Sequence, residues 1–138
     1  MLKWVETVEA EKKILKALSA AAAFLDGSML ALDEKDDDSL ADGVWHVAAE
    51  LEYALFLFSI VVQDEIDKSK WKLRPKLAKA EAGLMLVTVR GLLDKAEEGM
   101  GEGQLLDAFR RTYIARGCML KIQKDFDREK REAFRRKK

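Results

Sequence analysis

The sequence has few of the residues from which reactive sites and covalent cross-links are built. Its 138 residues include one cysteine, one histidine, one proline and no asparagine. Because a disulfide needs two cysteines, Cys118 cannot form one within the chain, and we expect a reducing, cytoplasmic location. The lack of asparagine, together with 36% charged residues, is typical of proteins from hyperthermophiles.

Long apolar runs and the short motifs of common enzymes are also missing. The longest largely apolar stretch covers residues 54–62, whereas a membrane-spanning helix needs about 20 such residues. We therefore expect no transmembrane helix and, given the amphipathic and charged N-terminus, no signal peptide. The sequence contains no glycine-rich phosphate loop, no cysteine pair and no Ser/His/Asp order typical of a hydrolase. These absences argue against nucleotide, thiol-redox and serine-hydrolase chemistry, and we expect no cofactor.

Helical periodicity runs along almost the whole chain, with apolar residues recurring in steps of three and four. Asp26-Gly27, Pro75 and the glycine cluster at 99–103 are the natural helix boundaries. We predict a single all-α domain, residues 1–138, with main helices at 1–26, 39–67, 75–98 and 104–135. Short connectors between long helices favour antiparallel neighbours, which predicts an up-down-up-down four-helix bundle.

The last predicted helix is longer than the helix that precedes it. At 1.5 Å per residue, a helix over 104–135 measures about 47 Å, whereas a helix over 75–98 measures about 36 Å. We therefore expect the C-terminal turns to project from the bundle and to carry a basic tail at 127–138. A projecting helix with no apolar face to bury is marginally stable on its own, so this tail should fray or bind a charged surface.

Charge is balanced overall, with 25 acidic and 25 basic residues, but it is sorted into blocks. Residues 33–67 contain eleven Asp or Glu and one lysine, residues 68–79 contain six Lys or Arg and no acid, and residues 105–138 contain twelve Lys or Arg and five acids. Sorted charge creates strong local fields even in a neutral protein. In the predicted topology these blocks would form an acidic pole around 33–42 and a basic pole from 68–79 and 124–138.

The predicted helix at 39–67 is apolar on every side. In a monomeric bundle one face of each helix should meet water, so this helix is either central or part of an interface between chains. We expect a homodimer in which this helix packs across a two-fold axis. The candidate interface residues are Phe56, Leu57, Ile60 and Val61.

A metal site is the least supported of the candidate sites. Glu11, His46, Glu50 and Glu81 stand in or beside apolar stripes, where carboxylates and one imidazole could converge on a cation. A di-iron bundle needs two Glu-x-x-His motifs, and this chain has one histidine and no such motif. Buried charges are usually paired, so we expect ion pairs instead, with Arg116 joined to Glu11 or Glu81.

Two basic segments could bind nucleic acid or another anion. Their candidate contact residues are Lys68, Lys70, Trp71, Lys72, Arg74, Lys76, Arg128, Arg131, Arg135 and Arg136. Lysine and arginine can contact a phosphate backbone while Trp71 stacks on a base. Alternatively, the first segment is a solvated loop whose tryptophan covers the end of the core. The cations of the second segment would then only interact favourably with the C-terminal end of a helix dipole. The neutral overall charge argues against nucleic-acid binding, because domains that bind nucleic acid are usually strongly basic.

The sequence therefore predicts a non-enzymatic helical bundle that acts as an interaction or scaffold module and associates first with itself. One alternative is binding of an RNA or DNA backbone, or of an acidic protein, through residues 68–79 and 124–138. A carboxylate metal site or an enzyme in the bundle core comes third.

Overall fold

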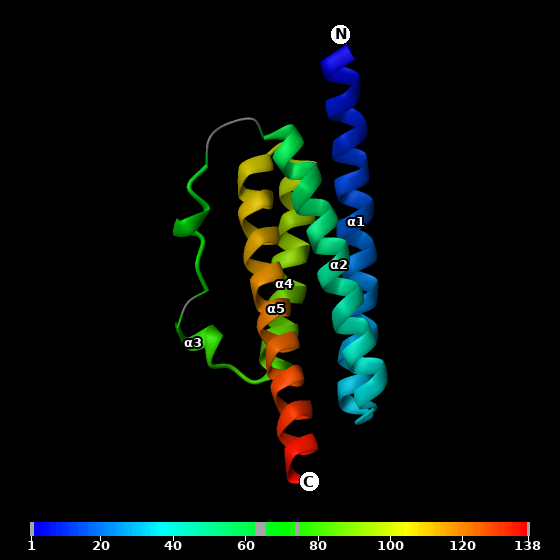
Figure 1. Cartoon of the computed structure of the whole chain (residues 1–138). Coiled ribbons are helices and arrows are strands. Elements are labelled where there is room, and N and C mark those ends of the chain that lie inside the picture. The colour runs from blue at the N-terminus through cyan, green and yellow to red at the C-terminus, as the bar shows by residue number, and fades with distance from the viewer. Residues whose placement is uncertain (1, 63–65, 74, 138) are drawn as a thin grey trace.

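A computed structural model describes residues 2–62, 66–73 and 75–137 of the chain (Figure 1). In these ranges the elements are α1 (Leu2–Asp33), α2 (Asp37–Val61), the short 3₁₀ helix η1 (Lys68–Lys70), α3 (Pro75–Ala78), α4 (Ala82–Gly101) and α5 (Leu105–Arg136). The described ranges hold no strand. The predicted all-α class is confirmed.

The four long helices pack side by side, with α1 against α2 and α4, and α5 against the same two helices. Figure 1 shows that α2 and α4 run in the same direction, because the chain between them travels back along the outside of α5. The predicted up-down-up-down order is therefore wrong, although each packed pair is antiparallel. A connector over residues 62–81 could span about 65 Å if fully extended, so its length permits this crossover.

Helix α1 continues well past the predicted stop at Asp26-Gly27, to Asp33. Ser28 and Ala31 are both buried, and the Ser28 hydroxyl donates a hydrogen bond to the Phe24 carbonyl at 2.9 Å. Burial beyond Gly27 outweighs the roughly 1 kcal/mol that a glycine costs inside a helix. The turn after α1 ends the helix with a positive backbone φ of 57° at Lys35.

The later boundaries differ from the prediction for local reasons. Helix α2 starts two residues early because Asp36 caps it, accepting a hydrogen bond from the Ser39 amide at 3.2 Å. Hydrogen bonds from Ser39 lower the pKa of the Asp36 carboxyl. The same helix ends at Val61, before the predicted residue 67, and Val62 is extended. The predicted helix at 75–98 is instead split into α3 and α4, and α5 lies within one residue of its predicted bounds.

The core lies between the four long helices. Within it, Phe58 of α2 and Phe109 of α5 stack with ring centroids 5.2 Å apart. Cys118 of α5 is fully buried in the same core, and this burial raises the pKa of its thiol to about 11. A neutral, enclosed thiol is inert, so Cys118 acts here as a small apolar residue.

Two of these helices, over Thr7–Asp33 and Asp37–Val61, are long and apolar enough to suit a membrane span by length and composition. In each case 44% of the apolar window is buried inside the bundle. Core helices of soluble proteins meet the same criterion, because a helix that is apolar on most sides is also what a bundle core requires.

The crossover also changes the distribution of charge. Figure 1 shows the acidic turn at 33–38 and the basic C-terminal turns of α5 at the same end of the molecule. Glu97, Glu98 and Glu102, which the predicted topology would place beside the acidic turn, lie at the other end, where α4 finishes. The predicted separation into an acidic and a basic pole is therefore wrong, because it assumed the opposite direction for α4.

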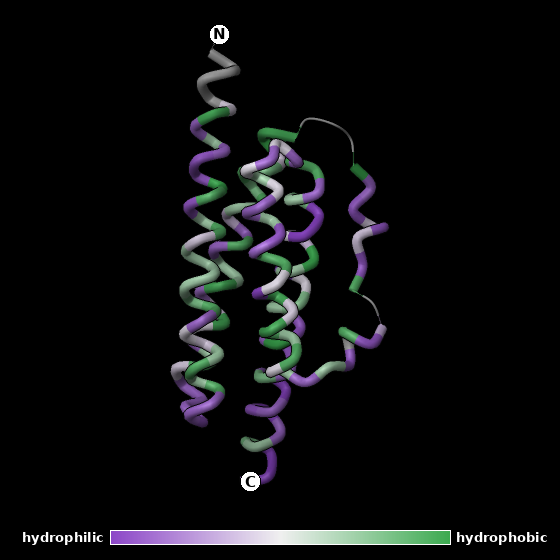
Figure 2. The backbone as a smooth tube through the Cα atoms, turned by 180° about the vertical axis from the view of Figure 1, so that it is seen from behind, coloured by the Kyte–Doolittle hydropathy of each residue, from purple (hydrophilic) through white to green (hydrophobic). Residues whose placement is uncertain are grey.

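The C-terminal turns of α5 extend past the α1–α2 turn in Figure 1, and Figure 2 shows mostly hydrophilic residues there with one short hydrophobic band. Side chains from 127 to 137 are all exposed. The opposite end of the bundle has a similar extension, formed by the first turns of α1.

Candidate interaction surface on helix α2

The outward face of α2 carries a row of large apolar side chains. Trp45, Tyr53, Phe56 and Ile60 are 59%, 46%, 62% and 49% exposed, respectively. Ala49 is exposed between them. Steps of four, four, three and four residues place all five on one side of a helix. We call this row the α2 stripe.

The structure places only half of the predicted interface residues on this stripe. Phe56 and Ile60 lie on it, whereas Leu57 is 6% exposed and belongs to the core. Val61 is half-buried and also packs against the core. Successive helical residues are 100° apart, so Phe56 and Leu57 cannot share a face. Trp45 and Tyr53 were not among the predicted interface residues, although their helical spacing from Phe56 indicates that they share its face.

Helix α1 extends the stripe on one side through aromatic contacts. Phe24, which is 39% exposed, stacks on the His46 ring with centroids 4.7 Å apart. The Trp45 ring meets His46 edge-on at 5.1 Å. The His46 Nε2 atom lies 3.5 Å from the carboxylate of Asp42, which is one helical turn before His46. Its acidic partner is therefore Asp42 and not Glu50, which is one turn after His46. His46 is thus part of an aromatic row with a carboxylate at its edge.

Helix α5 borders the stripe on the other side. Arg116 donates a hydrogen bond from Nη1 to the Glu52 carboxylate at 2.8 Å, and its guanidinium lies 5.2 Å from the centre of the Tyr113 ring. The predicted carboxylate partner for Arg116 is confirmed, although it is Glu52 rather than Glu11 or Glu81. The pair matters for the surface because it neutralises the acidic side chain nearest the middle of the stripe.

A hollow opens at the end of the stripe nearest the start of α2. It measures about 340 Å³ and is lined by Ala41, Trp45, Leu120, Gln123, Lys124, Phe126, Asp127 and Lys130. Four of its lining residues are apolar, and the other four, Gln123, Lys124, Asp127 and Lys130, are polar or charged side chains of α5. Trp45 belongs both to the hollow and to the α2 stripe, so the two features form one continuous surface.

The predicted metal ligands come from separate parts of the bundle. Glu11 lies in the N-terminal half of α1, His46 and Glu50 lie on α2, and Glu81 precedes α4 at the end where α1 finishes. Within the part of the chain that the structure describes, no three His, Cys, Asp or Glu side chains form a group suited to a metal ion.

The basic connector is held against α5 by its aromatic residue. The Trp71 ring lies edge-on to Phe109 at 5.3 Å and to Tyr113 at 5.6 Å, and the Lys68 ammonium lies 5.2 Å from the centre of the Phe109 ring. These contacts favour the structural interpretation of Trp71 over base stacking. Lys70, Lys72 and Lys76 are exposed, and Arg74 lies outside the described residues.

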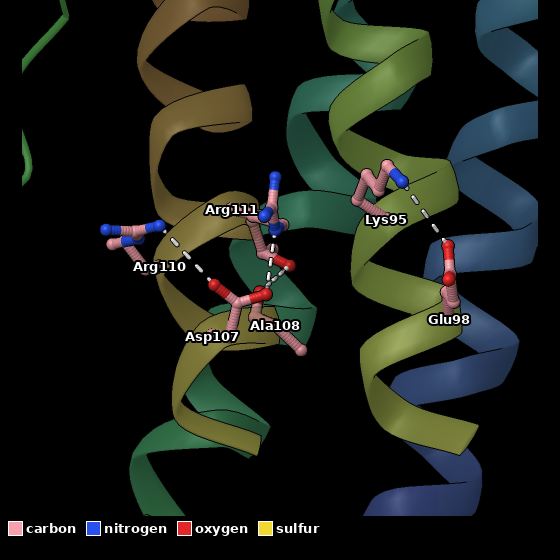
Figure 3. A network of polar contacts seen from close by, with 7 residues as sticks. Lys95, Glu98, Asp107, Ala108, Arg110 and Arg111 are labelled. Carbon is pink, nitrogen blue, oxygen red and sulfur yellow. Dashed lines mark hydrogen bonds and ion pairs between the residues drawn. The ribbon is translucent and has the colours of Figure 1, made fainter. Parts of the chain in front are cut away.

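Some of the arginines of α5 are paired locally. Figure 3 shows Asp107 in the first turn with Arg110 at 3.4 Å and Arg111 at 2.8 Å, beside a separate Lys95–Glu98 pair on α4. In the tail, Arg128 pairs with Asp125 at 3.4 Å and Arg136 pairs with Glu132 at 3.7 Å. The predicted contact residues Arg131 and Arg135 are exposed. Surface pairs of this kind contribute little stability and exchange readily with other anions.

Comparison of the chain with family models, curated proteins and solved structures gave no match.

Proposed function

We propose that the protein is a non-enzymatic interaction module that forms a homodimer through the α2 stripe. The observation that supports this proposal is the exposure of Trp45, Tyr53, Phe56 and Ile60 on one helix face. With about 200 Å² for each large side chain, the four expose roughly 400 Å² of mainly apolar surface. Apolar patches of about 300–600 Å² are the largest on typical monomers and are often functional.

A two-fold axis through the middle of the stripe makes it complementary to itself. In a two-fold interface the same patch meets its own copy in reverse, so two α2 helices would cross antiparallel. With the axis near Glu52 and Tyr53, Trp45 lies opposite the partner's Ile60, and the small Ala49 lies opposite the partner's Phe56. Arg116 holds Glu52 to one side at 2.8 Å, which reduces repulsion between the two Glu52 carboxylates at the axis.

The interface would have the usual anatomy of a soluble dimer. A standard interface buries about 800 Å² on each partner, with an apolar centre and a polar rim. The α2 stripe supplies the centre. Phe24 on α1 and Leu120 on α5 border it, and Asp42 and Lys124 lie farther out as rim residues.

The proposal is tested by placing a charge on the stripe. Phe56→Glu should raise the dimer dissociation constant at least about 100-fold, because a carboxylate would be buried twice in each dimer. Leu84→Glu is the matched control, since Leu84 is 60% exposed on α4, which packs against α1 and α5. Light scattering should give a dimer mass for the wild type and the control and a monomer mass for Phe56→Glu. Equal masses for all three proteins would refute the α2 interface.

Binding of a nucleic-acid backbone remains a second proposal, supported by the exposed cations at Lys70, Lys72, Lys76, Arg131 and Arg135. Deletion of residues 127–138 should leave the thermal midpoint nearly unchanged, because side chains from 127 to 137 are exposed. The deletion should also abolish any salt-sensitive binding of a single-stranded RNA oligonucleotide in fluorescence anisotropy. Full-length protein that fails to bind the oligonucleotide at low salt would exclude this function.

A further inference from the structure

The hollow beside Trp45 and the side chain of Ile60 stand at opposite ends of the α2 stripe. Trp45 and Ile60 are each seven to eight residues from the midpoint between Glu52 and Tyr53, or about 11 Å along the helix. A two-fold axis at that midpoint brings each of them to the position of the other. One end of the stripe has a recess and the other end has the half-exposed Ile60 side chain, so a two-fold axis places an apolar side chain near each recess.

We propose that the hollow formed by α2 and α5 is the receptor for Ile60 of a second copy of this chain. The inference rests on the dimer proposed above and adds its register, with Ile60 of each copy seated between Ala41, Trp45 and Leu120 of the other. The hollow measures about 340 Å³. Pockets for small ligands begin at about 300 Å³, so one isoleucine side chain fits with room for the adjoining helix surface.

The chemistry of the lining agrees with an apolar occupant. Ala41, Trp45, Leu120 and Phe126 contribute apolar surface. Gln123, Lys124, Asp127 and Lys130 of α5 line the rest of the hollow. Lys124, Asp127 and Lys130 are exposed to solvent, and the aliphatic stems of lysines commonly cover apolar contacts while the ammonium groups stay in water. Ile60 is 49% exposed in one copy, and burial in this hollow would remove that apolar surface from water.

A double-mutant cycle on the dimer dissociation constant tests the contact. Ala41→Phe fills the hollow, and Ile60→Ala removes the side chain that enters it. We expect each substitution alone to raise the dissociation constant at least about tenfold in sedimentation equilibrium. If the two substitutions acted independently, their fold-increases in the dissociation constant would multiply. We expect the dissociation constant of the double variant to be at least about tenfold below that product, because the filled hollow no longer meets a large side chain.

The cycle separates the two proposals. A wild-type chain that stays monomeric would refute both the dimer and this contact. A wild-type dimer in which the two substitutions act independently would refute only the contact. A dimer unaffected by Ala41→Phe would also refute it and would leave the hollow open to some other ligand.

Ala41 is half-buried, so a second experiment covers the case in which Ala41→Phe fails to fold. In a Cys118→Ala background, Ala41→Cys combined with Ile60→Cys should give a covalent dimer with a short bis-maleimide reagent. Ala41→Cys combined with Leu84→Cys is the matched control and should stay uncross-linked, because Leu84 lies on α4. A dimer by mass that cross-links no faster than the control would overturn the proposed register.

Discussion

At the scale of single residues, the packing of α2 against α1 at Ser28 depends on Gly43. A Cβ atom at this position would lie 2.2 Å from the Ser28 hydroxyl oxygen and 3.3 Å from the Ser28 Cβ atom. Ser28 is 1% exposed and its hydroxyl is bonded to Phe24, so it has little room to move. The two helices can keep this separation only while residue 43 has no side chain.

Gly43→Ala should lower the free energy of unfolding by about 2 kcal/mol, because an extra methyl group overpacks the helix interface. Gly91→Ala is the matched control, since nothing lies within 4 Å of a Cβ atom there, and it should stabilise the protein by about 0.5 kcal/mol. Urea unfolding measures both values. Ser28→Ala combined with Gly43→Ala should recover part of the loss. Equal stability of the Gly43 and Gly91 variants would contradict this description.

Sequence patterns predicted which type of residue a charged side chain would pair with, but not which individual residue. Arg116 stands among apolar neighbours, which predicted a carboxylate partner, but the choice of Glu52 depends on how α2 and α5 pack. His46 has an acidic residue one turn before it and another one turn after it. Both positions suit an i,i+4 contact, so the sequence could not choose Asp42 over Glu50.

At the scale of elements, the connector between α2 and α4 is held to the bundle by an aromatic cluster. Trp71 contacts the rings of Phe109 and Tyr113, and Leu73 lies 3.8 Å from the position that a Cβ atom of Gly117 would take. These contacts cover one side of α5 along the path of the crossover in Figure 1. The connector therefore contributes to the core even though it has little regular structure.

Trp71→Ala should destabilise the protein by about 2 kcal/mol, less than the loss for a fully buried tryptophan, because this side chain is half-buried. The amides of residues 66–73 should also exchange with solvent faster than in the wild type. Lys72→Ala, an exposed neighbour on the same connector, should change neither property. Unchanged exchange in the Trp71 variant would show that the connector is held by other contacts.

The presence of the long helices was predictable from the sequence, whereas several helix ends and the direction of α4 were not. Apolar periodicity correctly indicated the long helices, and α5 lies within one residue of its predicted bounds. The helix does not end at Asp26-Gly27, because Ser28 and Ala31 beyond it are buried in the bundle. Local sequence patterns do not indicate this burial. The predicted helices left a connector of only seven residues, 68–74, whereas the connector between α2 and α4 covers 62–81 and is long enough for a crossover.

At the scale of the whole molecule, the crossover decides which surfaces the protein offers to a partner. It brings the acidic turn at 33–38 and the basic tail to the same end, and it leaves the outer face of α2 uncovered between α1 and α5. The sequence indicated that the second helix had more apolar surface than one bundle needs. Assignment of that surface to Trp45, Tyr53, Phe56 and Ile60, with Leu57 turned inward, required the packing of all four helices.

The central claim is that two copies of this chain associate through the uncovered face of α2. Sedimentation equilibrium of the unmodified protein across about 1 to 100 µM tests it most directly, because mass action makes a reversible dimer depend on concentration. We predict twice the monomer mass at the upper concentrations and a decrease toward the monomer mass on dilution. A monomer mass throughout this range would contradict the claim.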